Sequence, residues 1–254
     1  MGTKLLDCLP IQLEQRSVFG TFSDFDHYVT ADEFTTTASN SGTVAVGDGA
    51  GGIVTISASD ASLVDEDETY LKGTIEIFKF ATDKPLIFEA RLKSTAANTA
   101  CFLANNLIIG VKDAVAADSI RDTGLGPAAS YSGALFFKAD GSNQWNVESS
   151  VAGTQTTVAV TGHAIANSTY QTLRIEAQPI SSTETEIKFF VAEDGKSFEQ
   201  VGLSTAGQQF INHRLTHTSA TEMQICLGIK AGASNTANTV PTLIVDYVGC
   251  WQQR

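Results

Sequence analysis

The sequence predicts an all-β fold in which two antiparallel sheets stack into a jelly-roll sandwich. Residues 86–93 alternate apolar and charged side chains, which is typical of a strand with one face in the core and one in water. The same two-residue period returns after residue 134 and continues towards the C-terminus. No strand–helix–strand pattern is evident, so we expect antiparallel pairing rather than a parallel sheet.

A glycine-rich hairpin opens the expected sandwich. Strands at 43–46 and 53–56 flank the turn at 47–52. A phosphate-binding loop is the alternative for these glycines, but no Lys-Ser or Lys-Thr pair ends the run and no amphipathic helix follows it. The next strands are expected at 74–80, 86–93, 100–103 and 107–112.

The second half of the chain begins with a long loop at 113–131, with one helical turn near 114–118. Two Asp-Gly pairs, Asp140-Gly141 and Asp194-Gly195, each predict a hairpin turn between strands. The remaining strands are expected at 135–138, 145–148, 173–177, 187–191, 198–201, 223–230 and 243–251.

The chain divides into an N-terminal arm or leader at residues 1–42 and one sandwich domain at residues 43–254. A chain of 254 residues can bury a full core, and sandwiches of this length are often single domains. The leader is apolar and then aromatic, so it needs a surface to lie against. Two placements stay open: packing along its own domain, or reaching onto a neighbouring subunit.

Charge and cysteine content exclude several classes of function. The formal net charge of −12 disfavours binding to nucleic acid phosphates. No stretch is long enough for a membrane span, and Asp7 and Pro10 interrupt the apolar runs that a signal peptide needs, so we expect synthesis in a cytoplasm. The four cysteines form no Cys-x-x-Cys pair and are expected as buried free thiols.

Two groups of residues suggest chemistry, but each has a simpler explanation. The run Asp65-Glu66-Asp67-Glu68 offers a carboxylate pair for glycoside hydrolysis or oxygen ligands for calcium, yet a solvated acidic loop is favoured. His213 and His217 would form a zinc pair on one face of a helix, but their polar context disfavours a helix. We therefore expect no catalytic residue, no metal site and no cofactor.

Four aromatic residues are candidates for stacking on sugar rings, and core or interface packing is the favoured alternative for each. They are Trp145, Trp251, Tyr131 and Tyr170.

An ordered series of strand patterns carries a family resemblance over about residues 43–251. These patterns lie at 84–92, 133–137 before Asp140-Gly141, 170–176, 187–191 and 243–248. The sequence resembles the concanavalin A-like, laminin-G-like jelly-roll structural proteins of tailed bacteriophages. The patterns are strands rather than catalytic signatures, so they bear on fold more than on function.

The resemblance implies a capsid decoration or cement protein on the exterior of the virion, synthesised in the host cytoplasm and bound to the outer surface of the major capsid protein. A homo-oligomer is expected, with a trimer favoured, and nucleic acid and membranes are not expected as partners. The alternative is a glycan- or receptor-binding module of a phage tail or fibre, although the calcium and sugar ligands of lectins are missing. The expected capsid-contact residues are Leu5, Leu6, Leu9, Ile11, Phe19, Phe22 and Phe25.

Overall fold

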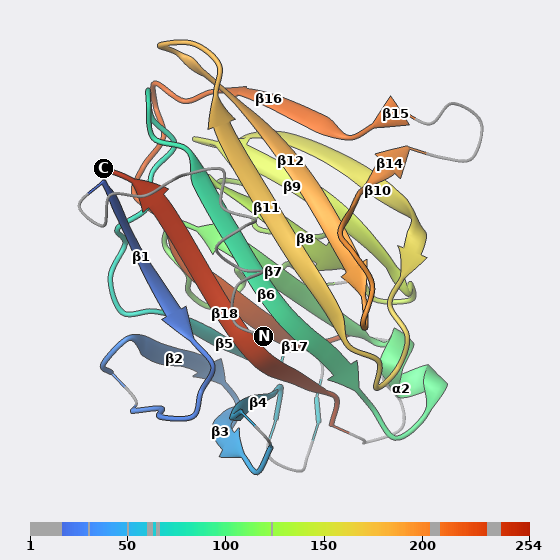
Figure 1. Ribbon diagram of the computed structural model, residues 1–254. Coiled ribbons are helices and arrows are strands. Elements are labelled where there is room, and N and C mark those ends of the chain that lie inside the picture. The colour runs from blue at the N-terminus through green and yellow to red at the C-terminus, as the bar shows by residue number, and fades with distance from the viewer. Residues whose placement is uncertain are drawn as a thin grey trace.

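Two antiparallel β-sheets stack face to face, which confirms the expected jelly-roll sandwich (Figure 1). The structure is a computed structural model, and it describes residues 17–254 except 30, 50, 60–62, 65–66, 123, 204–208 and 233–239. We call the two layers sheet A and sheet B.

Sheet A contains the strands that the alternating sequence pattern predicted most clearly. From edge to edge it runs through β13 (Glu199–Gln200), β12 (Glu184–Glu193), β11 (Gln171–Pro179), β6 (Leu86–Thr95), β18 (Thr242–Gln253), β4 (Ile53–Ser57) and β3 (Thr43–Gly47). Two further strands join it: β1 (Val18–Ser23) pairs with β18, and β16 (Asn212–Thr216) pairs with β12.

Sheet B lies behind sheet A in Figure 1. Its order is β15 (Gln209–Phe210), β14 (Gly202–Leu203), β10 (Thr154–Ala164), β9 (Gln144–Val151), β8 (Gly133–Lys138), β7 (Asn105–Lys112), β17 (Gln224–Ala231), β5 (Glu68–Gly73) and β2 (Phe34–Ser39). One short helix, α2 (Thr99–Leu103), precedes β7. The described residues form no helix with the length and apolarity needed to cross a membrane.

The core lies between the two sheets and is built from the inward residues of each strand. Trp145 shows the packing at its centre. Its side chain is fully buried, its ring meets Phe136 edge to face at 5.9 Å, and its Nε1 donates to Gln171 Oε1 at 3.0 Å. The indole therefore has both its apolar surface and its N–H satisfied inside the protein.

The three predicted hairpins are confirmed, and two predicted strands are wrong. β3–β4, β8–β9 and β12–β13 pair as expected, and Gly141 and Gly195 supply the positive φ that their turns need. The 74–80 segment crosses from sheet B to sheet A, so it pairs only through the single bridge Phe78–Met223. Residues 100–103 belong to α2, because Asn98 Oδ1 caps the helix by accepting from Cys101 N at 2.9 Å.

The described part of the N-terminal segment lies within the sandwich. β1 adds to sheet A beside β18, and β2 adds to sheet B beside β5. Of the two placements left open by the sequence, β1 and β2 follow the first and pack along their own domain. Residues 1–16 lie outside the described residues.

Residues 113–122 and 124–132 cross the face of sheet B that points away from sheet A, and we call these residues the strap. The strap contributes Val115, Ile120 and Tyr131 to a second apolar cluster, where they meet side chains from four strands of the sheet: Tyr70, Ile108, Leu135 and Cys226. Every residue of β7, β8 and β17 is consequently buried. The loop that the sequence predicted here is therefore a cover for sheet B.

A buried lysine fastens the strap. Lys230 Nζ lies 2.7 Å from Asp118 Oδ1, 2.5 Å from Asp122 Oδ1 and 3.5 Å from Glu68 Oε2, with none of the lysine side chain exposed. Desolvation opposes the charged form of Lys230, but the hydrogen bonds to the two aspartates and the charge of Glu68 raise its pKa above the usual range. The lysine stays charged and links β17 to the strap.

His213 links the two sheets across the core. It lies on β16, its Nδ1 is 2.9 Å from Ser149 Oγ on β9, and its ring packs edge to face on Phe189 at 5.1 Å. Burial lowers the pKa of His213 to about 4. His217 has partners of its own, with Nδ1 at 2.9 Å from Thr185 Oγ1. Each histidine is thus committed to a separate hydrogen bond.

We expect Lys230→Met to loosen the strap selectively. The variant leaves the buried Glu68 without its cation, a loss that typically costs about 3–5 kcal/mol. Cys226 lies under the strap, whereas Cys250 and Cys101 lie in the main core. Alkylation followed by peptide mass spectrometry should therefore show faster labelling of Cys226, with Cys250 and Cys101 still protected. Equal acceleration at all three thiols would indicate global unfolding and contradict a separately opening strap.

The low pKa of His213 predicts a specific loss of stability in acid. The unfolded chain takes up a proton near pH 6.5 and the folded protein only near pH 4, so stability falls as the pH drops through this window. Between pH 7 and 4.5 the contribution is about 2–3 kcal/mol. Urea unfolding should show that His213→Gln removes this part of the pH dependence. His27→Gln, at an exposed histidine, is the matched control and should retain it.

Candidate functional site

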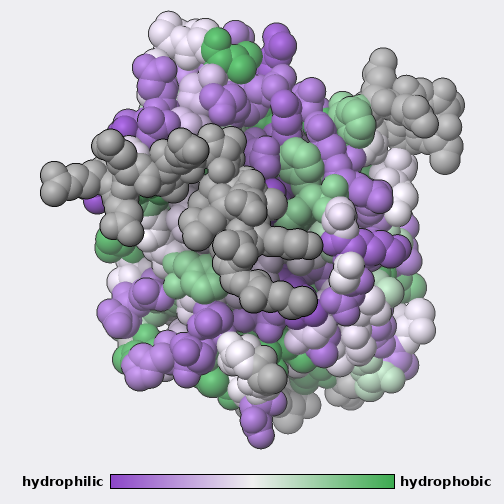
Figure 2. Space-filling view, viewed as in Figure 1, coloured by the Kyte–Doolittle hydropathy of each residue, from purple (hydrophilic) through white to green (hydrophobic). Residues whose placement is uncertain are grey.

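The outer face of sheet A, which points away from sheet B, carries a row of aromatic and charged residues. The strand register places Phe22 opposite Gly249, Gly249 opposite Glu89, and Glu89 opposite Arg174. The row thus crosses β1, β18, β6 and β11 at one level. Where Figure 2 shows this side of the molecule, hydrophobic residues are scattered among hydrophilic ones.

Three rings at one end of the row form what we call the aromatic cluster: Phe22, Tyr247 and Trp251. The ring of Phe22 lies 6.0 Å from Tyr247 and 6.2 Å from Trp251, and it is nearly parallel to the indole. A Cβ on Gly249 would lie 2.3 Å from the indole ring, so the missing side chain lets Trp251 lie over this strand. Phe22 is 44% exposed, which leaves the cluster open to a partner.

A buried ion pair supports the aromatic cluster. Arg174 donates from Nε and Nη2 to Glu89 Oε2 at 2.9 and 2.6 Å, and Tyr247 donates its hydroxyl to Glu89 Oε1 at 2.6 Å. Burial and the charge of Glu89 raise the pKa of Tyr247 well above its usual range, so the phenol remains a donor. The alternating pattern predicted that Glu89 would face solvent, but this prediction is wrong, because Glu89 is only 3% exposed.

A more exposed charged group lies along the same strands. Arg91 pairs with Asp246 at 2.6 Å and with Asp194 at 2.9 Å. The guanidinium of Arg91 lies 4.0 Å from the centre of the Tyr170 ring, and Lys93 Nζ lies 4.5 Å from it. Tyr170 therefore binds cations of its own chain.

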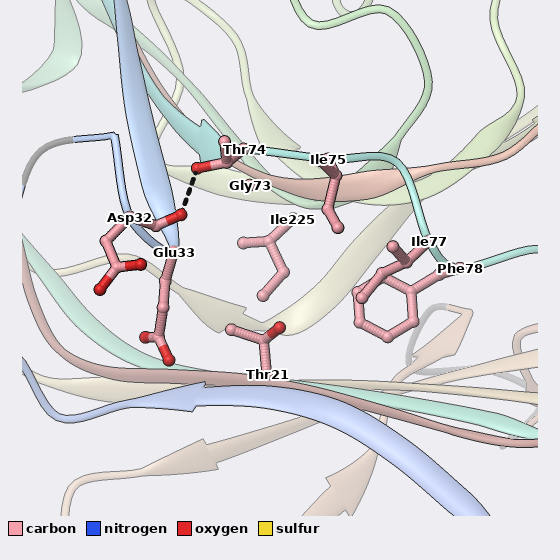
Figure 3. Close-up of a pocket in the computed structure, with 9 residues that line it drawn as sticks. All are labelled: Thr21, Asp32, Glu33, Gly73, Thr74, Ile75, Ile77, Phe78 and Ile225. Atoms are coloured by element: carbon pink, nitrogen blue, oxygen red, sulfur yellow. Dashed lines mark hydrogen bonds between the residues drawn. The ribbon is translucent and has the colours of Figure 1, made fainter.

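The sandwich opens beside β1, where a hollow of about 220 Å³ lies between the sheets (Figure 3). Ile225 of β17 forms its back, Thr21 of β1 lies below, and Ile77 and Phe78 form one wall. Glu33 lies on the opposite wall and extends towards Thr21. Phe19 stacks on Phe78 at 5.8 Å and so supports the apolar wall from within.

A second hollow of about 270 Å³ adjoins the first, with Asp32 and Glu33 lining both. It lies along the connection from β1 to β2, and Phe22 is among its lining residues. Together the two hollows form what we call the β1–β2 groove. Thr74 fixes its wall, since Thr74 N donates to Glu33 O at 3.0 Å and Thr74 Oγ1 donates to Asp32 O at 2.9 Å.

The structure separates the aromatic residues that the sequence grouped as capsid contacts. Phe19 is half-buried against Phe78, and Phe22 is exposed in the aromatic cluster. Phe25 is fully buried and packs on Phe34 at 5.8 Å, so it has no surface for a partner. The other predicted contacts, Leu5, Leu6, Leu9 and Ile11, lie outside the described residues.

The candidate sugar platforms differ in how much ring surface they offer. Trp145 and Tyr131 are buried, with at most 2% exposed. The ring of Tyr170 carries Arg91 and Lys93, and Trp251 stacks with Phe22. Of the four, Trp251 is the one that belongs to the aromatic cluster.

The prediction of a solvated acidic loop is wrong for its described part. Asp67 is fully buried, and Glu68 begins β5 with 2% exposed. Glu68 accepts from Tyr70 at 2.6 Å and from Asp118 N at 2.9 Å, so it belongs to the fastening of the strap. Asp65 and Glu66 lie outside the described residues. The described residues include no group of three or more His, Cys, Asp or Glu side chains suited to a metal ion.

The β1–β2 groove is a feature that the sequence interpretation missed. Its walls come from β1, from the start of β2 and from the 73–78 crossing, which are far apart in sequence. No local signal in the sequence indicated the groove, because Ile75 and Ile77 fit the alternation of the strand predicted at 74–80.

Comparison with known proteins identifies the fold. No protein-family model matches the sequence, and no curated protein is significantly similar to it. An endo-1,3-β-glucanase from Streptomyces sioyaensis superposes with a TM-score of 0.59 at 16% identity, covering 96% of this chain and 98% of that one. Arcelin-5, a lectin-like defence protein from Phaseolus vulgaris, gives 0.54 at 9% identity, covering 94% and 99%.

Peanut lectin gives a TM-score of 0.57 at 8% identity, with 92% of this chain and 97% of the lectin covered. The shared feature of these neighbours is the architecture, since their sequence identities to this chain are low. The protein therefore has the concanavalin A-like, legume-lectin-like jelly-roll sandwich fold.

Proposed function

We propose that this protein is a non-catalytic structural protein of a phage virion, a capsid decoration protein that binds the outer surface of the major capsid lattice. The observation that carries the proposal is the exposed aromatic cluster at the β1 edge of sheet A. Such a cluster, surrounded by polar residues, is typical of a site for protein association. The phage assignment itself rests on the sequence resemblance.

The strap removes part of sheet B from the surfaces that a partner could contact. The second face of sheet B is apolar beneath the strap, with Ile108, Leu135 and Cys226 packed against Val115 and Ile120. A substrate on that face would first have to displace the strap. The outer face of sheet A and the β1–β2 groove remain open, as do parts of sheet B outside the strap such as β10.

Ring geometry favours a protein partner over a sugar. A pyranose stacks on a free aromatic face, but Trp251 is stacked with Phe22, and Tyr170 is occupied by two cations. Clustered rings with one exposed member instead resemble the hot spot of a protein interface. A trimer would repeat this contact around a symmetry axis and strengthen attachment by avidity.

Co-sedimentation with phage heads assembled without this protein tests the proposal. We expect the intact chain to bind, and Phe22→Ala to weaken binding about tenfold, as loss of an exposed hot-spot ring does. Phe210→Ala is the matched control because Phe210 is also exposed, at 62%, but lies on β15 of sheet B. A further variant should lack residues 1–16 only, since β1 and β2 belong to the sheets.

Circular dichroism and thermal unfolding would establish that both phenylalanine variants remain folded. Failure of the intact chain to bind any head, or equal binding by Phe22→Ala and Phe210→Ala, would reject attachment through the aromatic cluster.

A second candidate is carbohydrate binding, favoured by Trp251 and Tyr247 on the open face and by the lectins among the structural neighbours. A glycan array tests it with the intact chain. Specific signals that disappear in Trp251→Ala and persist in Phe210→Ala would support a glycan-binding module. An array without signals would reject it.

A further inference from the structure

The two hollows of the β1–β2 groove differ in chemistry. The first has an apolar back and wall, formed by Ile77, Phe78 and Ile225. The second is lined by four carboxylates, Asp24, Asp26, Asp32 and Glu33. Since Asp32 and Glu33 line both hollows, an extended ligand could place an apolar group in one and a charged group in the other.

The carboxylates of the groove are available to a ligand. No ion pair among the described residues includes Asp24, Asp26, Asp32 or Glu33. All four are at least partly exposed, and the chain as a whole carries a net charge of −12. The field in the groove therefore favours a cation.

The division of the β1–β2 groove into two adjoining hollows suits separate side chains of one extended ligand. The hollows measure about 220 and 270 Å³, which suits one or two side chains in each. An extended peptide delivers neighbouring side chains to two adjoining hollows without filling a single large cavity.

We propose that the β1–β2 groove binds an extended basic segment of a protein partner, with an aliphatic side chain against Ile225 and Phe78 and a Lys or Arg beside Glu33 and Asp32. The partner's protein nature rests on the proposed attachment function, whereas the basic and aliphatic character follows from the groove itself. Phe22 lines the acidic hollow and belongs to the aromatic cluster, so one partner can contact both.

Labelled peptides test this recognition with the full chain. The probe is a fluorescent octapeptide of alternating lysine and leucine, followed by anisotropy at low and at physiological ionic strength. Two comparison peptides replace leucine by serine, or lysine by glutamate. We expect saturable binding of the lysine–leucine peptide that weakens with salt, weaker binding of the lysine–serine peptide, and none of the glutamate–leucine peptide.

A pair of charge reversals locates the site. Glu33→Lys should weaken binding of the lysine–leucine peptide about tenfold, because repulsion replaces attraction in the groove. Glu184→Lys makes the same change in net charge at an exposed residue of β12, and it should change binding less than about twofold if only distant, screened charge is involved. Equal weakening by both variants, or tight binding of the glutamate–leucine peptide, would overturn the proposal.

Binding to heads separates this inference from the attachment function. If heads bind the intact chain but the peptide does not bind in a Glu33-dependent way, the groove inference fails and attachment stands. If the peptide binds and Glu33→Lys abolishes it while heads recruit nothing, the groove inference holds and capsid attachment fails.

Discussion

The charge of Lys230, held inside the protein by Asp118, Asp122 and Glu68, decides which surfaces the sandwich offers to a partner. It fastens the strap over sheet B, so β7, β8 and β17 are buried on both faces. A charged lysine is stable at this buried position only because carboxylates surround it. The outer face of these strands is therefore closed to a partner, and we assign recognition to the outer face of sheet A and to the β1–β2 groove, although β10 and Phe210 of sheet B are also exposed.

Much of the fold could be predicted because its signals are local. Alternation identified β6 and β11, and the Asp-Gly pairs identified two hairpins. The α2 segment was misassigned because four apolar or small residues suit either a strand or a helix, and only the cap at Asn98 decides. The 74–80 segment has a strand pattern, but it crosses between the sheets and therefore has no neighbouring strand to pair with along its length.

The site was predicted less well because its residues meet only through tertiary contacts. Phe22 and Phe25 look alike in the sequence, yet one is exposed and the other is fully buried. Their separation follows from β1, which ends at Ser23 and so lets the chain turn Phe25 into the core. Likewise Lys230 and Asp118 are separated by 112 residues, and no local sequence pattern around either residue predicts their pairing.

The outer face of sheet A combines rigidity with an open end, and this combination suits attachment. Glu89 accepts from both Arg174 and Tyr247, which fixes the tyrosine of the aromatic cluster before any partner arrives. Fixed rings lose little side-chain entropy on binding, so more of the contact energy is retained. The groove beside them supplies carboxylates that form no ion pair with the described residues, and these add orientation and charge selectivity to an otherwise apolar contact. An apolar anchor beside an acidic groove therefore selects a partner that carries both an aliphatic and a basic side chain.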